Sequence, residues 1–373
     1  MDARTPRDAQ EVGATAPPSA PKRGGRALRI LVTFAIAAAG GALAYGLQIP
    51  LPWMLGPLFV CAGASLLGYQ IEIMPMGREL GQVAVGLAVG MRFTPAVLAT
   101  TLTLLPHMIV ATLYVIAFTV AAAFLHRALA GIDYDTAFFA TAAGGMADMA
   151  VVAEERGGDP TVVSITHAIR VATVVSVVPI LVFALGEPGT MDNATEGASD
   201  NLLLIAFCLA LAYGTTLLFR RTPFPNPWLV GPIFLGTALG ASGLLLVDVP
   251  WVLIVLAQIL IGTWLGCRFR RDVLARLPRA ALSALAVSLF MVAAAAAGSF
   301  VLAAASGLPF STSFLALAPA AVTEMVITAQ AMNIDAQIVT AFHVMRIAVV
   351  SSTILLVFAL FRKLVEATNG SRV

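Results

Sequence analysis

Apolar runs of about 20 residues recur along this 373-residue chain and restrict it to one broad class of fold. A run of that length lets an α-helix cross the hydrocarbon core of a bilayer, with its backbone hydrogen bonds made inside the helix. None of the runs shows the alternating pattern of an outer-membrane barrel strand. Hydrophobic residues make up 59% of the chain and charged residues 11%, which is unlike soluble domains. The sequence therefore predicts an all-α polytopic membrane protein.

The chain also repeats itself about 176 positions apart. Pro-Trp-x-x-Gly-Pro at 52–57 returns at 227–232, and Gln-x3-Gly-x3-Gly-x-Arg-Phe at 82–93 returns at 258–269. Most of the residues that recur are polar residues, glycines or prolines, and the sequence around them is apolar. A duplicated membrane protein that keeps such residues in both copies is expected to build one site where the copies meet.

Each half is predicted to contain six apolar segments. Ala-Ala-Gly-Gly at 142–145 and Ala-Pro-Ala-Ala at 318–321 interrupt the fifth segment of each half, and such residues break helices. The expected segments are 28–47, 51–69, 78–95, 103–126, 134–153 and 160–185, then 201–220, 227–246, 251–269, 280–305, 310–331 and 335–361.

Basic residues indicate the topology, because short cytoplasmic loops carry an excess of Lys and Arg. The segment 1–27 is basic, polar and proline-rich, which predicts a disordered cytoplasmic tail, whereas 186–200 has no Lys or Arg and is expected to be a periplasmic linker. The membrane repeats are then 28–185 and 201–363, and 364–373 is a cytoplasmic tail. This assignment predicts two inverted membrane repeats, each with about five crossings plus a re-entrant or broken helix. Twelve crossings with parallel halves remain the alternative.

Two acidic residues, Asp148 and Glu324, occupy equivalent positions just after the two interruptions. A charged carboxylate near the bilayer centre costs on the order of 3 kcal/mol on insertion scales. We therefore expect the pair to bind a coupling ion, either a proton or sodium. The structural alternative places both residues near the interface or neutralises them with arginine.

A His-x-x-Arg pair lies in the sixth segment of each half: His167 with Arg170, and His343 with Arg346. Residues three apart share one helical face. The two arginines could pair with the acidic residues, or bind an anionic or zwitterionic solute, while the histidines could relay protons. Snorkelling of the arginines to lipid headgroups is the structural alternative.

The third segments carry Gln82 and Gln258, which we expect to line the point where the repeats cross. Glycines spaced four apart accompany them, at 86 and 90 and at 262 and 266, and a further pair lies at 236 and 240. This spacing favours close helix packing, and it is also compatible with partly unwound helices around a site.

Several kinds of chemistry have no support in the sequence. It contains no nucleotide-binding glycine loop, zinc-binding helix motif or nucleophile elbow, so we expect no cofactor, no metal and no catalytic residues. The three cysteines are not close in sequence, and the net charge of +2 does not suggest nucleic-acid binding.

The paired motifs, with Gly-Gly-Met-Ala-Asp-Met at 144–149, resemble the AbrB duplication family of bacterial inner-membrane proteins over about 28–363. Members are labelled AbrB family transcriptional regulators or ammonia monooxygenases, and the resemblance implies these labels only as names. A copper monooxygenase needs a cluster of ligands, but of the four histidines His107 and His126 have no counterpart at the repeat offset. A DNA-binding regulator needs a soluble basic module, which the chain lacks.

The sequence thus favours an ion-coupled secondary transporter or exporter of a small anionic or zwitterionic solute, working by alternating access. Its partners would be the solute, a proton or sodium, and the lipid bilayer, and the sequence is compatible with a homo-oligomer. Two alternatives stay open: a membrane-bound metal oxygenase, and a membrane sensor that affects gene expression indirectly.

Overall fold

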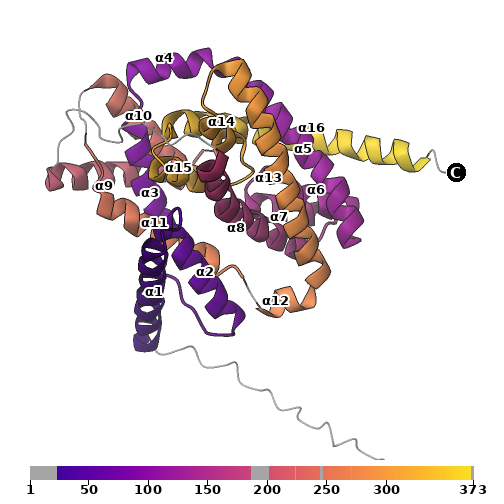
Figure 1. Cartoon of the computed structure of the whole chain (residues 1–373), viewed down its shortest axis with the longest axis horizontal. Coiled ribbons are helices and arrows are strands. Elements are labelled where there is room, and N and C mark those ends of the chain that lie inside the picture. Colours follow the sequence, from indigo (N-terminus) through magenta and orange to yellow (C-terminus); the bar gives the residue numbers. More distant parts are fainter. Residues whose placement is uncertain (1–22, 186–200, 223, 244–246, 270, 371–373) are drawn as a thin grey trace, which may run out of the picture.

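The computed structural model describes residues 23–185, 201–222, 224–243, 247–269 and 271–370, and these fold into sixteen helices (Figure 1). The predicted all-α class is confirmed. Six of the helices are long and apolar enough to cross a bilayer, as a multi-pass membrane protein requires. They are α1 (Arg23–Gly46), α5 (Leu105–Ala130), α8 (Pro160–Leu185), α9 (Leu202–Phe219), α13 (Pro278–Ser306) and α16 (Ala336–Gly370).

Four apolar helices are shorter, with 14 to 16 residues each. At 1.5 Å per residue they extend roughly 21–24 Å, less than the hydrocarbon core of about 30 Å. They are α2 (Pro52–Leu66), α3 (Gly77–Gly90), α10 (Pro227–Ser242) and α11 (Trp251–Gly266). Two further helices, α4 (Pro95–Thr103) and α12 (Arg271–Arg276), were not predicted, and α4 is bent by 92° from α3.

The fifth segment of each half is a broken helix, and both breaks fall where the sequence predicted them. Residues 142–145 separate α6 (Tyr134–Thr141) from α7 (Met146–Glu155). Residues 318–321 separate α14 (Phe310–Leu317) from α15 (Val322–Ala331). The first residue of each break has extended backbone angles, with ψ of 142° at Ala142 and 132° at Ala318, so the helix cannot continue through it.

The helices form two groups (Figure 1). The short-helix group contains α1–α3 and α9–α11, and the broken-helix group contains α5–α8 and α13–α16. In both groups the repeats interlock: α2 packs against α11 as α10 packs against α3, and α8 packs against α13 as α16 packs against α5. Each half therefore supplies elements to both groups, and the repeats cannot be separate domains.

The equivalent helices α5 and α13 lie side by side and antiparallel. Arg279, near the start of α13, donates from Nε to the carbonyl oxygen of Leu129 at the end of α5, over 2.8 Å. Midway along the pair, the Tyr114 hydroxyl donates to the carbonyl oxygen of Ala294, over 2.7 Å. Two neighbouring copies of one helix thus run in opposite directions.

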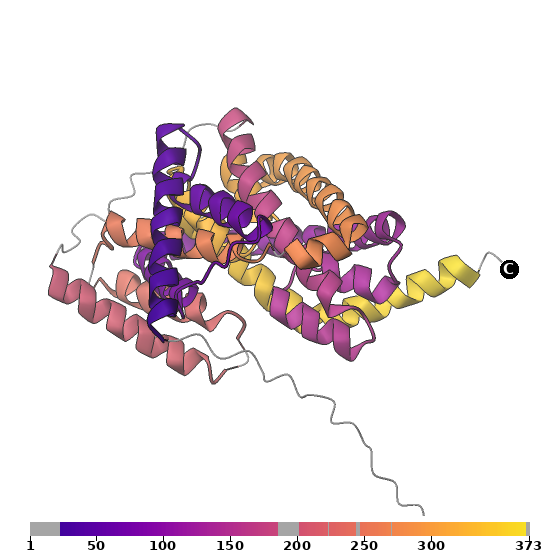
Figure 2. The same cartoon turned by 90° about the horizontal axis from the view of Figure 1, so that it is seen from below.

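The ends of the described chain are more helical than expected. Residues 1–22, 186–200 and 371–373, on which the predicted tails and linker largely fall, lie outside the described residues. α1 already begins at Arg23, and α16 continues to Gly370, beyond the expected tail boundary at 363 (Figure 2). Phe361 and Val365 are buried in one apolar cluster with Phe138 of α6, so the packed part of α16 extends to Val365.

The spaced glycines allow backbones to meet, which confirms their predicted packing role. A Cβ atom on Gly86 of α3 would lie 2.7 Å from the carbonyl oxygen of Leu229 in α10. One on Gly262 of α11 would overlap the carbonyl oxygen of Met54 in α2. Leu229 and Met54 are themselves equivalent in the repeat, so the same close approach is built twice.

We expect Gly86→Ala to lower the stability of the protein by about 1–3 kcal/mol, because the added methyl group has no room against the α10 backbone. Gly214→Ala in α9 is the matched control. Nothing lies within 4 Å of a Cβ atom there, so alanine should be neutral or slightly stabilising. Apparent melting temperatures in detergent compare the two variants, and equal values would contradict this packing.

Candidate functional site

The His-x-x-Arg pair of α16 lies against the carboxyl end of α14. His343 Nε2 is 2.9 Å from the carbonyl oxygen of Leu315. Arg346 donates to the carbonyl oxygens of Ala318 and Ala320, over 2.8 and 2.6 Å, and to Nδ1 of His343, over 2.7 Å. Because Nδ1 accepts this bond, the imidazole proton sits on Nε2 and is donated to Leu315. Both side chains are buried.

The pair on α8 repeats this arrangement at the end of α6. His167 Nε2 is 3.0 Å from the carbonyl oxygen of Phe139, and Arg170 donates to the carbonyl oxygens of Thr141 and Ala142 over 3.0 and 2.9 Å. Arg170 also donates to Nδ1 of His167, over 3.1 Å. The two arginines are close enough for their charges to repel each other. The two helix breaks are thus held by equivalent contacts, one set in each repeat.

These contacts explain why both pairs accompany a helix break. The last carbonyl groups of a helix have no partner within it and carry the negative end of the helix dipole. Arg170 and Arg346 supply both the donors and the positive charge. Neither guanidinium forms an ion pair with Asp148 or Glu324 in the described part of the chain, contrary to one of the expectations from sequence. Neither snorkels, since Arg170 is 5% exposed and Arg346 is 4% exposed.

The acidic residues begin the second half of each broken helix. Asp148 lies in the first turn of α7 and Glu324 in the first turn of α15, where a negative charge complements the helix dipole. Their surroundings differ greatly, because Asp148 is exposed whereas Glu324 is 1% exposed. Oε2 of Glu324 has no hydrogen-bond partner among the described residues, and the positive charge of Arg78 acts on this carboxylate. The repeat thus places equivalent carboxylates in opposite environments.

The glutamines differ in a similar way. Gln82 of α3 is buried, and its Nε2 donates to the Thr323 hydroxyl of α15 over 2.9 Å, next to Glu324. Gln258 of α11 is also buried, but residue 147, the counterpart of Thr323, is alanine and has no hydroxyl to offer. α15 packs against α3, and α7 makes no comparable contact with α11 among the described residues. The two repeats are therefore closed on the side where α3 meets α15, and they are apart on the equivalent side, between α11 and α7.

A cavity of about 400 Å³ lies on the side where the repeats are apart, between α7–α8 and the α11–α12 region. Ser164 and Phe269 line it and are half-buried. Their counterparts on the other side, Thr340 and Phe93, are 1% and 5% exposed. One copy of this surface is open, and its equivalent is closed.

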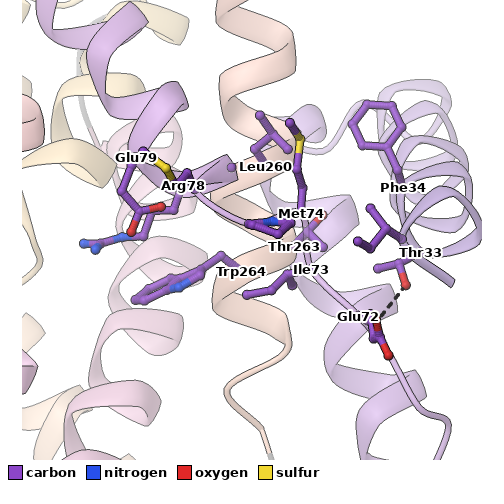
Figure 3. A pocket seen from close by; sticks show the side chains of 14 residues that line it. Thr33, Phe34, Glu72, Ile73, Met74, Arg78, Glu79, Leu260, Thr263 and Trp264 are labelled. Carbon is purple, nitrogen blue, oxygen red and sulfur yellow. Dashed lines mark hydrogen bonds between the residues drawn. The ribbon is translucent and has the colours of Figure 1, made fainter. Parts of the chain in front are cut away.

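A smaller cavity of about 140 Å³ lies between α1, the start of α3 and α11 (Figure 3). Trp264 forms part of its wall, and the guanidinium of Arg78 lies 4.2 Å from the centre of the indole ring. The guanidinium of Arg268, which lines the larger cavity, is 4.1 Å from the same ring. Arg78 and Trp264 were not predicted as site residues, because their repeat counterparts are Ile254 and Ala88 and the repeat therefore gives no signal at either position.

The comparison with known proteins agrees with the resemblance seen in the motifs. The family described as "Transition state regulatory protein AbrB" matches residues 53–362. The chain belongs to the AbrB family. One relative, "Uncharacterized protein YhjN" of Bacillus subtilis (strain 168), is 26% identical over 351 residues, covering 87% of this chain and 90% of the relative. Another, "Putative regulator AbrB" of Escherichia coli (strain K12), is 23% identical over 306 residues, covering 80% and 87%.

This AbrB family member shows no group of three or more His, Cys, Asp or Glu residues that could hold a metal ion, within the residues described. The unrepeated His126 is buried between Thr166 and Ser283, with ring nitrogens 3.1 Å from each hydroxyl. The repeated histidines are each fully engaged with a carbonyl oxygen and an arginine. Asp159 and Asp335, which also repeat, cap the first turns of α8 and α16.

Proposed function

We propose that this protein is an ion-coupled secondary transporter of a small anionic or zwitterionic solute, working by alternating access in the bacterial inner membrane. The observation that carries this proposal is the unequal burial of two equivalent carboxylates. Asp148 is exposed close to Met146, which lines the open cavity, while Glu324 is buried where the repeats are closed. Duplicated halves with one side open and the other closed are what alternating access requires.

An inverted arrangement of the repeats accounts for both the packing and the charges. Adjacent equivalent helices that run antiparallel, as α5 and α13 do, are expected when one half is inverted relative to the other. The open cavity borders α12 and its exposed basic residues Arg271 and Arg276. Since Lys and Arg favour the cytoplasm, this side would face inward, and the conformation is inward-open.

The two kinds of charged residue then have separate tasks. Arg170 and Arg346, with their histidines, neutralise the carboxyl ends of α6 and α14 and hold both breaks in shape. Asp148 and Glu324 lie at the start of the opposing half-helices and take up the coupling ion in turn. A buried carboxylate is costly even where the charge of one arginine, here Arg78, acts on it, and a bound proton or sodium ion lowers that cost. Burial would therefore follow ion binding.

Flux into proteoliposomes tests this function. Purified protein should accumulate a labelled small carboxylate or amino acid when a proton or sodium gradient is imposed, and should exchange internal for external solute without one. Liposomes without protein are the control. Folded protein that shows neither accumulation nor exchange across a panel of such solutes would contradict the proposal.

A further inference from the structure

We propose that the 400 Å³ cavity binds the transported solute and that this solute is a monocarboxylate with an apolar body, held at its carboxylate by Arg268. The inference rests on the proposed function and specifies its substrate class. It assigns carboxylate binding to Arg268, which lies against Trp264, whereas the repeated acidic and His-x-x-Arg residues have other tasks. The volume falls in the range of ordinary small-molecule sites.

The charge of the cavity selects an anion. Among the described residues that line it, Arg268 is the one charged side chain. Its guanidinium has five donors, and its contacts among the described residues are with the Met146 sulfur, at 3.5 Å, and the Trp264 ring. A thioether is a weak acceptor and an aromatic face carries no full charge, so neither neutralises the guanidinium. A carboxylate can accept two parallel hydrogen bonds from this group.

The rest of the lining selects an apolar body and disfavours a zwitterion. Ile165, Ala168, Ile169, Phe269 and Leu274 present hydrocarbon, and two hydroxyls come from Thr161 and Ser164. The described lining includes no acidic side chain that could pair with an ammonium group. The ammonium group of an amino acid would therefore lie against hydrocarbon with no acidic side chain in this lining to pair with, which is unfavourable.

Arg78 strengthens the anion preference from the neighbouring cavity. Its guanidinium lies over the Trp264 ring, as that of Arg268 does, so the two groups are no farther apart than the sum of their distances from the ring centre. Arg78 acts electrostatically on Arg268, and its charge also acts on Glu324. A carboxylate bound at Arg268 would relieve the repulsion between the two arginines. The indole ring between the cavities therefore reports on occupancy of the site.

Tryptophan fluorescence tests the site directly. A variant with Trp53, Trp228 and Trp251 changed to phenylalanine retains Trp264 alone. Titrated in nanodiscs with acetate, butyrate, hexanoate, octanoate and benzoate, it should show a saturable change for at least one acid. The matched primary amide and the matched ω-amino acid should bind roughly tenfold or more weakly. Absence of saturable binding by every acid, or equal binding of acid and amide, would overturn the proposal.

Two substitutions locate the binding. Arg268→Gln should weaken carboxylate binding by about ten- to a hundredfold, whereas Arg276→Gln, on the exposed face of α12, should leave it unchanged. If Arg268→Gln does not fold, Ser164→Phe fills the cavity from α8 and should also abolish binding. Wild-type affinity in both folded variants would overturn the assignment. If carboxylate binding depends on Arg268 but no solute flux is measured, the site is supported and the proposed transport function is contradicted. If solute flux is measured and is unchanged in Arg268→Gln, the transport function is supported and this site is contradicted.

Discussion

Glu324→Gln is expected to abolish ion-driven accumulation of solute, down to the level of liposomes without protein. The amide cannot take up or release a proton and is a poor sodium ligand, while it keeps nearly the shape of the buried side chain. Because Oε2 of Glu324 has no hydrogen-bond partner in the part of the chain that the structure describes, the variant should be as stable as the wild type to within about 1 kcal/mol, or more stable. Uptake under an imposed gradient, measured together with the melting temperature, checks both expectations.

Solute exchange without a gradient separates coupling from transport in this variant. Glu324→Gln should retain exchange, because exchange needs the conformational change but no net ion movement. Asp148→Asn should lose accumulation in the same way, although its side chain is exposed in this conformation. Glu155→Gln, an exposed carboxylate of α7, is the matched control and should transport normally. Normal accumulation by both the Glu324 and Asp148 variants would show that the coupling role is wrong.

Arg346→Ala is expected to produce the largest loss of stability. It removes the donors to Ala318, Ala320 and His343 and leaves carbonyl groups at the α14–α15 break without partners in the protein interior. Each unsatisfied buried group costs about 1–3 kcal/mol, so the total should reach about 3 kcal/mol or more. Arg346→Lys should rescue little, because one ammonium cannot match the planar fork of a guanidinium. The apparent melting temperature in detergent measures the loss.

Arg362→Ala provides the control on the same helix. Arg362 forms an ion pair with Asp135 at 2.7 Å, but its side chain is 50% exposed, and exposed ion pairs contribute little. Arg362→Ala should therefore lower the stability much less than Arg346→Ala, although Arg362 has a carboxylate partner. Equal destabilisation by the two substitutions would mean that the His-x-x-Arg pair does not support the helix break.

The sequence predicted the helical class, the segment positions and the breaks at 142–145 and 318–321 because these follow from local properties. The length of an apolar run and the positions of glycine and proline determine where one helix begins and ends. The spacing of glycines determines how closely two neighbouring helices can pack. The helices α4 and α12 were missed because each is short and continues directly from a longer segment in the sequence. No periodic pattern marks a helix of six to nine residues there.

The candidate residues were found as a set, but their partners were not. Asp148 and Arg170 both recur in the second half, which suggested an ion pair. The carbonyl groups that Arg170 binds belong to the backbone, which every residue has, so the sequence does not indicate which residues supply them. His167 and His343 each bind the carbonyl group 28 residues earlier, at Phe139 and Leu315, but this equal spacing follows from the repeat offset and does not by itself indicate contact.

The unequal burial of Asp148 and Glu324 could not be predicted in this way. The two residues occupy equivalent positions, and the difference arises from how the broken-helix group sits against the short-helix group. Sequence patterns report which residues are equivalent, whereas the environment of each depends on the conformation of the whole protein. Arg78 and Trp264 were not predicted as site residues for a different reason, which is that each occurs in one repeat only.

Cysteine labelling on the two sides of the membrane tests alternating access between inverted repeats most directly. In a background with Cys61, Cys208 and Cys267 changed to alanine, Ser164→Cys should react with a membrane-impermeant maleimide from the cytoplasmic face, and its counterpart Thr340→Cys should be protected. With transported solute and an imposed ion gradient, Thr340→Cys should become reactive from the periplasmic face. Labelling of both positions from the same face, or protection of Thr340→Cys under every condition, would contradict the account.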